Sequence, residues 1–296
     1  MDLSLTLLGT GTPTPSLRRM CSGYLLRCGE AVILFDHGFG AHHRLLEQNV
    51  RATDVTHLFL SHLHYDHIGD VPRLLLTRWD QGAGKVDELQ IYGPPPTNKV
   101  IEGIIARTGP FGLDLVARTE DQSSLDVYVA RGGEGARRWP TPVVNEVHPG
   151  DHIDGGGWRV RVARAEHFTP YLNCCAFRFE AQGRSIVYSG DSGPTDAIRA
   201  LAQDCDILVH MCHFLTGTAP SRAFETSCCG HLELAALAAE ARVRTLVITH
   251  ITEQFDRPGV RERTISEMAQ VFKGTIVFGE DGLSVPINGG APALLA

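Results

Sequence analysis

The stretch SHLHYDHIGD, residues 61–70, places three histidines and two aspartates within ten positions. The apolar run before it, residues 55–60, is typical of a buried strand, and residues 68–76 after it are typical of the start of a helix. The polar residues therefore fall on a loop at the C-terminal end of a strand. Loops in that position commonly carry binding and catalytic groups. We interpret this loop as the centre of a functional site.

Further polar residues follow other strand-like runs later in the chain. His167 comes after residues 160–165, Asp191 after 185–189, and His250 after 246–249. If these strands end at one rim, the sequence brings together a set of seven candidate metal ligands. These are His62, His64, Asp66, His67, His167, Asp191 and His250.

Five imidazoles and two carboxylates form a ligand set that suits first-row metals, with zinc first and manganese or iron as alternatives. In an extended turn His62 and His64 point the same way and could bind one ion. Asp66 and His67 would then face a second metal position next to the first. The simplest arrangement is therefore two ions that share one bridging carboxylate. For an isolated histidine such as His57, ordinary packing is a better explanation than metal binding. Packing is a weak explanation for the HxHxDH pattern, because three further candidate ligands also follow the ends of strands.

The remaining sequence indicates one α/β domain over residues 1–296. Strand-like runs occur in both halves with helices between them, which predicts two sheets packed face to face under outer helices. Neither a short repeat nor a linker divides the chain. Loop or lid insertions are expected at about 78–90 and 110–145, and a helix followed by a hairpin is expected at the C-terminal end.

Composition limits the partners and the compartment. The formal charge is −7, and arginines and lysines are scattered rather than gathered into a stripe, which gives no support to binding of a long nucleic acid. The chain lacks an 18-residue apolar run and a cationic leader, so we expect neither a membrane span nor secretion. Its eight cysteines contain no CxxC pair and are interpreted as reduced thiols of a cytoplasmic protein.

The ligand pattern resembles that of the metallo-β-lactamase superfamily. His62-x-His64-x-Asp66-His67 is followed by the three later ligand candidates in the family's order. Within the superfamily the chain is most similar to the ribonuclease Z and arylsulfatase-type branch. The phrases that carry this similarity are LGTGTPTPSLRR, LFDHGFGAHHRLL, IYGPP, IVYSGDS and LVITH, and together they cover most of the chain.

The resemblance implies a four-layer αββα sandwich with a binuclear metal site at its edge. The residues implied to hold the first ion are His62, His64 and His167, and those implied to hold the second are Asp66, His67 and His250. Asp191 would bridge both ions, and Asp36 would orient a ligand histidine by hydrogen bonding. A metal-bridging hydroxide would be the nucleophile.

Three residues are candidates for a catalytic role beside the ions. Asp66 could orient the nucleophile or take its proton. His231 matches a histidine that assists the leaving group in this branch, with a helix-capping neighbour as the alternative. Ribonuclease Z members carry His-Glu-Ala-Thr-Phe where this chain has His-Met-Cys-His-Phe at 210–214, so Met211 replaces the glutamate. His213 could contact substrate or metal, or pack at the rim, and both interpretations stay open.

Three functions compete. The first is a hydrolase of a small molecule: a phosphodiester, an aryl or carboxylic ester, a sulfate ester, a lactone or an activated aryl ether. The second is a ribonuclease Z-like phosphodiesterase acting on RNA; the long arm of such enzymes is missing, because His167 and Asp191 are only 24 positions apart. The third is a non-hydrolytic metal-binding or redox protein, which the complete ligand set disfavours. The sequence predicts the small-molecule hydrolase, and the family implies a homodimer.

Overall fold

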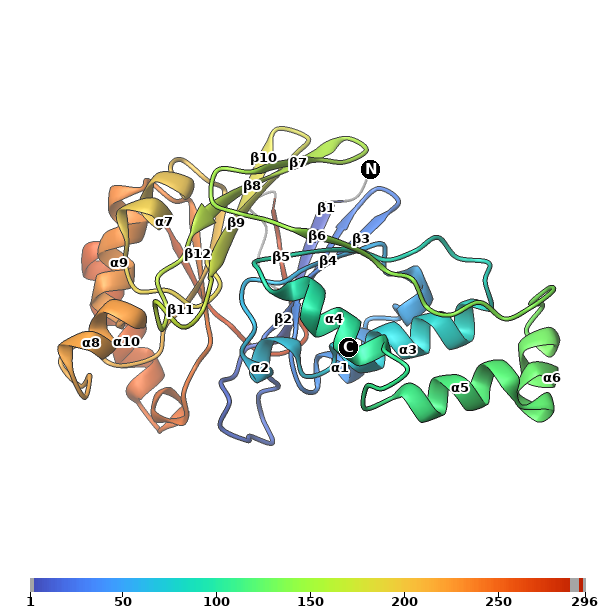
Figure 1. Ribbon diagram of the computed structural model, residues 1–296. Coiled ribbons are helices and arrows are strands. Elements are labelled where there is room, and N and C mark those ends of the chain that lie inside the picture. The colour runs from blue at the N-terminus through green and yellow to red at the C-terminus, as the bar shows by residue number, and fades with distance from the viewer. Residues whose placement is uncertain (1–2, 288–292, 295–296) are drawn as a thin grey trace.

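Two β-sheets pack face to face, and helices cover the outer side of each (Figure 1). The computed structural model describes residues 3–287 and 293–294, so the extreme ends of the predicted domain lie outside the described residues. Apolar side chains from both sheets, among them Phe35, Phe59, Phe177 and Tyr188, form the core between them. Helices bury a second and a third apolar cluster against the outer faces. The predicted four-layer αββα sandwich is confirmed.

The first sheet has eight strands in the order β15-β14-β1-β2-β3-β4-β5-β6. Its strands are β1 Leu3–Gly9, β2 Gly23–Cys28, β3 Ala31–His37, β4 His57–Phe59, β5 Gln90–Gly93, β6 Val143–Glu146, β14 Leu283–Val285 and β15 Ala293–Leu294. Strands β3 to β6 are parallel to one another, whereas β1 and β2 are antiparallel to their neighbours. The ends of β3 and β4 therefore lie at the same edge of the sheet.

The second sheet has seven strands in the order β13-β12-β11-β10-β9-β8-β7. Its strands are β7 His152–Asp154, β8 Trp158–Arg164, β9 Cys175–Ala181, β10 Arg184–Tyr188, β11 Ile207–Met211, β12 Thr245–Thr249 and β13 Thr275–Phe278. β10 to β13 are parallel, and β8 runs in the same direction because two antiparallel pairings separate it from β10. The C-terminal ends of β8, β10 and β12 thus share one edge, as the ligand hypothesis requires.

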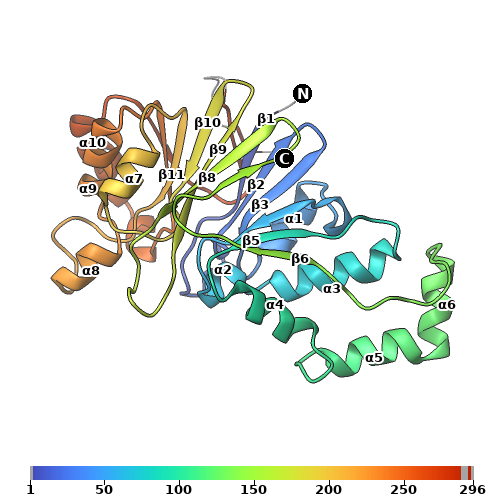
Figure 2. The same ribbon diagram turned by 45° about the horizontal axis from the view of Figure 1, so that its top comes forward.

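The helices divide between the two outer faces (Figure 2). They are α1 Ala41–Glu47, α2 Tyr65–Ile68, α3 Val71–Gly82, α4 Thr97–Ile105, α5 Gly112–Glu120, α6 Gln122–Ala130, α7 Asp196–Leu201, α8 Arg222–Ser227, α9 His231–Glu240 and α10 Val260–Val271, with 3-10 turns at Ala52–Asp54 and Glu253–Asp256. Helices α1, α3 and α4 pack on the first sheet, and α7, α9 and α10 pack on the second. Within the described part of the chain, no helix combines the length and apolarity that a membrane crossing needs.

One of two local expectations is wrong. The segment 110–145, expected as loop, contains α5 and α6. Asp80, at the end of α3, accepts hydrogen bonds from the guanidinium groups of Arg118, Arg131 and Arg137 and so holds these helices. The expected closing helix and hairpin are present as α10 and as the antiparallel pair of β14 and β15, while β13 between them joins β12 in the second sheet. A short apolar strand followed by a turn cannot show from its own sequence which sheet it joins.

The position of α5 and α6 bears on the predicted lid. Helix α3 is 12 residues long, which corresponds to roughly 18 Å. Its N-terminus adjoins the 61–70 loop, whereas Asp80, which binds the arginines of the α5–α6 region, lies at its other end. Figures 1 and 2 both show α6 beyond the far end of α3 and α5 leading out to it, away from α2. These helices therefore extend the first outer layer and do not cover the 61–70 loop.

Candidate metal centre

The 61–70 loop is held at the end of β4 by a buried carboxylate. The Ser61 backbone N–H donates to Asp36 Oδ1 at 2.7 Å, and the Ser61 hydroxyl donates to Asp36 Oδ2 at 2.7 Å. His64 is extended and precedes the single turn of α2, which carries Asp66 and His67. This turn points both side chains inward, where they are buried.

Four of the predicted ligands form one group. The ligand atoms of His62, His64, His167 and Asp191 all lie within 4.8 Å of one another. His62 Nε2 is 3.0 Å and His167 Nε2 is 3.3 Å from His64 Nδ1. The group joins the loop after β4 to the ends of β8 and β10, so both sheets contribute to it.

The other three predicted ligands form a second group beside the first. The ligand atoms of Asp66, His67 and His250 also lie within 4.8 Å of one another. Asp191 Oδ2 lies 3.1 Å from His250 Nε2, 3.5 Å from His67 Nε2 and 3.6 Å from His167 Nε2. It therefore contacts both groups, which is the position a bridging carboxylate must occupy.

Polar atoms without partners show that these residues fit a metal ion. Among the described residues, Asp66 Oδ1 and His67 Nε2 are buried and have no hydrogen-bond partner. An unpaired buried polar atom costs about 1–3 kcal/mol, so a native fold seldom keeps two of them together without a ligand. Imidazole nitrogens and carboxylate oxygens are suitable donors for divalent first-row ions.

Electrostatics favours the metal-binding protonation states of the first ligand group. Burial lowers the pKa of His62 well below its ordinary value and also lowers the pKa values of His64 and His167, so their lone pairs are free. Burial opposes charge on Asp191, yet His250 and His67 outweigh it and hold the pKa of this carboxyl well below its usual range. His62, His64 and His167 thus present neutral imidazoles around an anionic carboxylate, whereas burial is outweighed at His67 by Asp191 and Asp36, which raise its pKa well above the ordinary value.

Asp36 contacts a ligand histidine as the resemblance implied. Its Oδ2 accepts from His67 Nδ1 at 2.7 Å and also from the Tyr188 hydroxyl. Asp36 and His250 both have positive φ, 55° and 52°, in the left-handed region that few non-glycine residues adopt. Backbone strain of this kind tends to cluster at functional sites.

The two other histidines with predicted catalytic roles differ in position. His213 lies beside the cluster, with its Nδ1 3.1 Å from His250 Nδ1, and burial lowers its pKa to about 4. His231 lies outside both ligand groups. It accepts from the Thr216 backbone N–H at Nδ1, 3.0 Å, and its Nε2 contacts Glu267 Oε2 at 2.7 Å. Both ring nitrogens are engaged there, which favours a structural role, and a leaving-group role stays a prediction.

The sequence did not point to Glu267 or Ser227 as partners of site histidines. Ser227 supplies a backbone carbonyl to His167 Nδ1 at 2.7 Å, and a carbonyl has no side-chain signature. Glu267 lies within α10, 36 positions from His231. A helix-face pattern could have marked Glu267 as inward-facing, but nothing in the sequence specified its partner.

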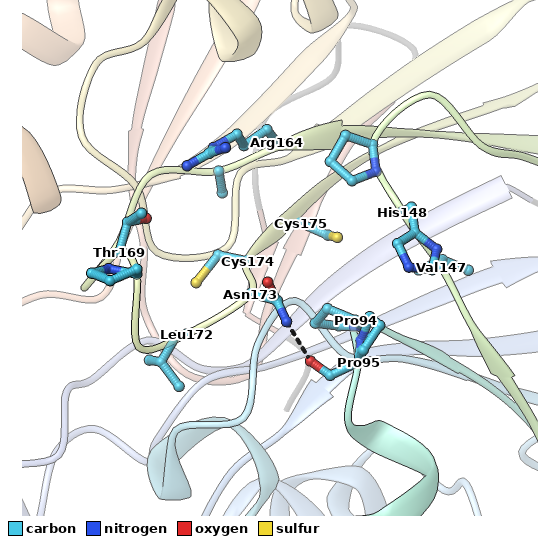
Figure 3. A pocket seen from close by; sticks show the side chains of 13 residues that line it. Pro94, Pro95, Val147, His148, Arg164, Thr169, Leu172, Asn173, Cys174 and Cys175 are labelled. Atoms are coloured by element: carbon cyan, nitrogen blue, oxygen red, sulfur yellow. Dashed lines mark hydrogen bonds between the residues drawn. The ribbon is translucent and has the colours of Figure 1, made fainter.

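A cavity of about 380 Å³ lies along the loop that carries His167 (Figure 3). Ala165 and Thr169, on either side of this histidine, line it, and Pro94 and Pro95 after β5 form part of the opposite wall. Asn173 bridges these two sides by donating to the Pro95 carbonyl at 2.8 Å. The cavity is small, with apolar walls beside a few polar groups.

Aromatic side chains lie both beside the ligand groups and away from them. Phe168 is about half exposed, and its ring lies edge-on to His64 and His167 with centroids 5.4 and 4.6 Å away. Trp79 and Trp139 instead lie under the guanidinium groups of arginines from the α4–α6 region. One aromatic side chain therefore borders the ligand groups, while the two tryptophans stabilise the outer layer.

Comparisons with known proteins agree with this geometry. Residues 32–251 match a family described as the beta-lactamase superfamily domain. A ribonuclease Z of Mycobacterium bovis (strain BCG / Pasteur 1173P2) is 33% identical over 286 residues, which cover 94% of this chain and 96% of that protein.

Solved structures share the fold. The metallo-beta-lactamase fold protein YhfI from Bacillus subtilis superposes with a TM-score of 0.72 at 21% identity, covering 96% of this chain and 98% of that chain. The short form of human tRNase Z superposes with a TM-score of 0.67 at 22% identity, covering 96% of this chain and 99% of that chain.

Proposed function

The chain belongs to the beta-lactamase superfamily and is a metal-dependent hydrolase, and on that premise we propose that it cleaves a phosphodiester in a small-molecule substrate. The observation that supports this most is the position of Asp191 Oδ2 between two groups of ligand atoms. That arrangement suits two divalent ions close together, as in many enzymes that displace a phosphate oxygen. The nitrogen-rich ligand set favours zinc, with manganese or iron as alternatives.

The residues around the ions have separable tasks. When bound, the ions supply Lewis acidity for the substrate oxygen and a water of lowered pKa. Asp66 contacts His250 Nε2 through Oδ2 at 3.3 Å, which leaves the unpartnered Oδ1 to orient the attacking water or to hold its proton. Asp36 keeps the His67 ring in place because its Oδ2 accepts a hydrogen bond from His67 Nδ1.

The site favours a compact substrate. The chain between His167 and Asp191 is a loop followed by β9 and β10, which pair directly through a turn at 182–183, so it provides no long arm for a polynucleotide. The cavity beside His167 and the half-exposed Phe168 would suit a small, partly apolar group. RNA is the second candidate, because the Mycobacterium bovis relative named ribonuclease Z aligns with almost the whole chain.

Metal analysis combined with a substrate panel tests this proposal. We expect close to two zinc ions per chain and chelator-sensitive hydrolysis of bis-p-nitrophenyl phosphate, in preference to p-nitrophenyl sulfate, p-nitrophenyl acetate, a lactone or an aryl methyl ether. A tRNA precursor with a 3′ extension belongs in the same panel. Its cleavage at much higher kcat/KM would assign RNA as the substrate, and absence of metal under metal-replete conditions would contradict the proposal altogether. A homodimer and a cytoplasmic location stay predictions that light scattering and fractionation can check.

A further inference from the structure

The outer nitrogen of His250 has an unusual partner. Its Nε2 faces the cluster, 3.1 Å from Asp191 Oδ2 and 3.3 Å from Asp66 Oδ2. Its Nδ1 faces away from the cluster and lies 3.1 Å from Nδ1 of His213. Two imidazoles thus meet nitrogen to nitrogen directly behind a predicted ligand.

The other candidate ligand histidines whose Nε2 faces the cluster show a different arrangement. Nδ1 of His67 contacts Asp36 Oδ2 at 2.7 Å, and Nδ1 of His167 contacts the Ser227 carbonyl at 2.7 Å. Nδ1 of His62 lies 3.0 Å from the Ser61 hydroxyl, which itself donates to Asp36 and therefore accepts from the histidine. An oxygen accepts the outer proton in all three cases, whereas His250 meets an imidazole.

The direction of the His250–His213 hydrogen bond follows from the chemistry of imidazole. A histidine that binds an ion through Nε2 carries its proton on Nδ1, so His250 is the donor. His213 must then accept at Nδ1 and carry its own proton on Nε2. Among the described residues, His213 Nε2 has no hydrogen-bond partner and is not sealed from solvent, so this tautomer leaves no buried donor unpaired.

The His213 ring is held in place from several sides. Its backbone N–H donates to the Cys229 carbonyl at 2.8 Å. Its own carbonyl accepts from Thr252 Oγ1 at 3.1 Å and from Gln254 Nε2 at 3.0 Å, both on the loop that follows His250. The ring packs between His250 and Phe224, with centroid distances of 5.2 and 5.5 Å. These contacts fix the position of the acceptor atom.

We propose that His213 is a positioning residue for the second ion: it accepts the Nδ1 proton of His250 and so fixes the tautomer and the ring orientation of that ligand. This inference rests on the proposed function, because it requires an ion at Asp66, His67 and His250. It gives a role to His213, which occupies the position of the threonine in the His-Glu-Ala-Thr-Phe sequence of ribonuclease Z members. The role accounts for the contact of the His213 ring with His250, which simple packing at the rim would not require.

Paired substitutions test the role of the acceptor. His213→Phe keeps an aromatic ring between His250 and Phe224 but removes the acceptor, and His213→Asn removes the ring but keeps an oxygen close to the Nδ1 position. We expect His213→Phe to weaken binding of the second ion by about 10- to 100-fold, measured by competition with a chromogenic chelator, while the first ion stays bound. His213→Asn should recover most of that loss. His57→Phe is the control, since His57 is half-buried and packs edge-on to Trp158 outside the cluster.

Equal losses in the Phe and Asn variants, or no loss in either, would overturn the role of the acceptor. A measurement on the unsubstituted protein keeps the test independent of folding. With histidine labelled with ¹⁵N and zinc bound, we expect the Nδ1–H tautomer for His250 and the Nε2–H tautomer for His213. A proton on Nδ1 of His213 would contradict the inference. Failure of the unsubstituted protein to bind a second ion would instead contradict the proposed function.

Discussion

Replacing Asp36 by asparagine should weaken the metal centre without removing a ligand. Oδ1 of Asp36 accepts from the Ser61 N–H, and Oδ2 accepts from the Ser61 hydroxyl, the Tyr188 hydroxyl and His67 Nδ1. If the asparagine oxygen keeps the hydrogen bond from the Ser61 N–H, the asparagine NH₂ group faces the other three donors. The two hydroxyls can rotate to accept, but the N–H of a metal-bound His67 cannot.

The magnitude follows from that one unsatisfied donor. Asp36 and His67 are both fully buried, so water cannot replace the lost partner. A buried N–H without an acceptor costs about 1–3 kcal/mol, which corresponds to roughly 5- to 150-fold in a dissociation constant. This range overlaps the 10- to 100-fold that loss of a hydrogen-bond partner behind a metal ligand typically costs. We therefore expect Asp36→Asn to bind the second ion some tens of times more weakly and to lose turnover at limiting zinc.

Chelator competition for the metal and urea denaturation for stability separate the two possible effects. Asp206→Asn is the matched control: Asp206 is also buried and accepts from the Ser185 N–H and from Arg184 and Arg244, at the end of the second sheet opposite the ligands. It should lower stability and leave metal affinity unchanged. Unaltered affinity in Asp36→Asn, or an equal loss of affinity in Asp206→Asn, would refute the reasoning.

Three further predictions concern other parts of the chain. Asp191→Ala removes the oxygen that contacts both ligand groups, so metal content should fall below two ions per chain and nearly all turnover should be lost; full metal content by elemental analysis would rule out a bridging role. His231→Ala should keep the metals and lower the free energy of unfolding by about 1–3 kcal/mol, because two hydrogen bonds are lost, one of them to Glu267. Turnover should fall equally for substrates with good and with poor leaving groups. A steeper fall for poor leaving groups would indicate that His231 is the general acid after all. Burial raises the pKa of Asp80, but hydrogen bonds from Arg137 and Arg131 outweigh it and lower the pKa from its ordinary value. The stabilisation by Asp80 is therefore present above about pH 4 and lost as pH falls through the lower folded pKa. Protection factors for hydrogen exchange in α5 and α6, which correct for the intrinsic effect of pH on the exchange rate, should fall in acid for the unsubstituted protein and already be low at neutral pH in Asp80→Asn.

The parallel strands β10, β11 and β12 could be predicted because each is a short, largely apolar run. β10, β11 and β12 are buried nearly throughout, as expected for parallel strands covered on both faces. Helix α6 could not be predicted in the same way. Of its nine residues only Tyr128 is buried, while Val127 and Val129 are exposed, so its apolar residues do not mark an inner face. Its position depends instead on the contacts of its neighbours with Asp80, which join segments about 40 to 60 positions apart in the sequence.

The ligands and the partners behind them differ in how far sequence can reveal them. The candidate ligands follow the ends of four strands, β4, β8, β10 and β12, so the strand pattern and the polar residues after each strand together mark their places. The partners come from elsewhere: Asp36 is 31 positions from His67, His213 is 37 from His250, and the Ser227 carbonyl is 60 from His167. Since these partners set the orientation and basicity of the ligands, related chains can retain every ligand and still differ in metal affinity. Substitutions at positions such as 213 are therefore where we expect members of this family to diverge in the ion they retain, while the HxHxDH sequence stays the same.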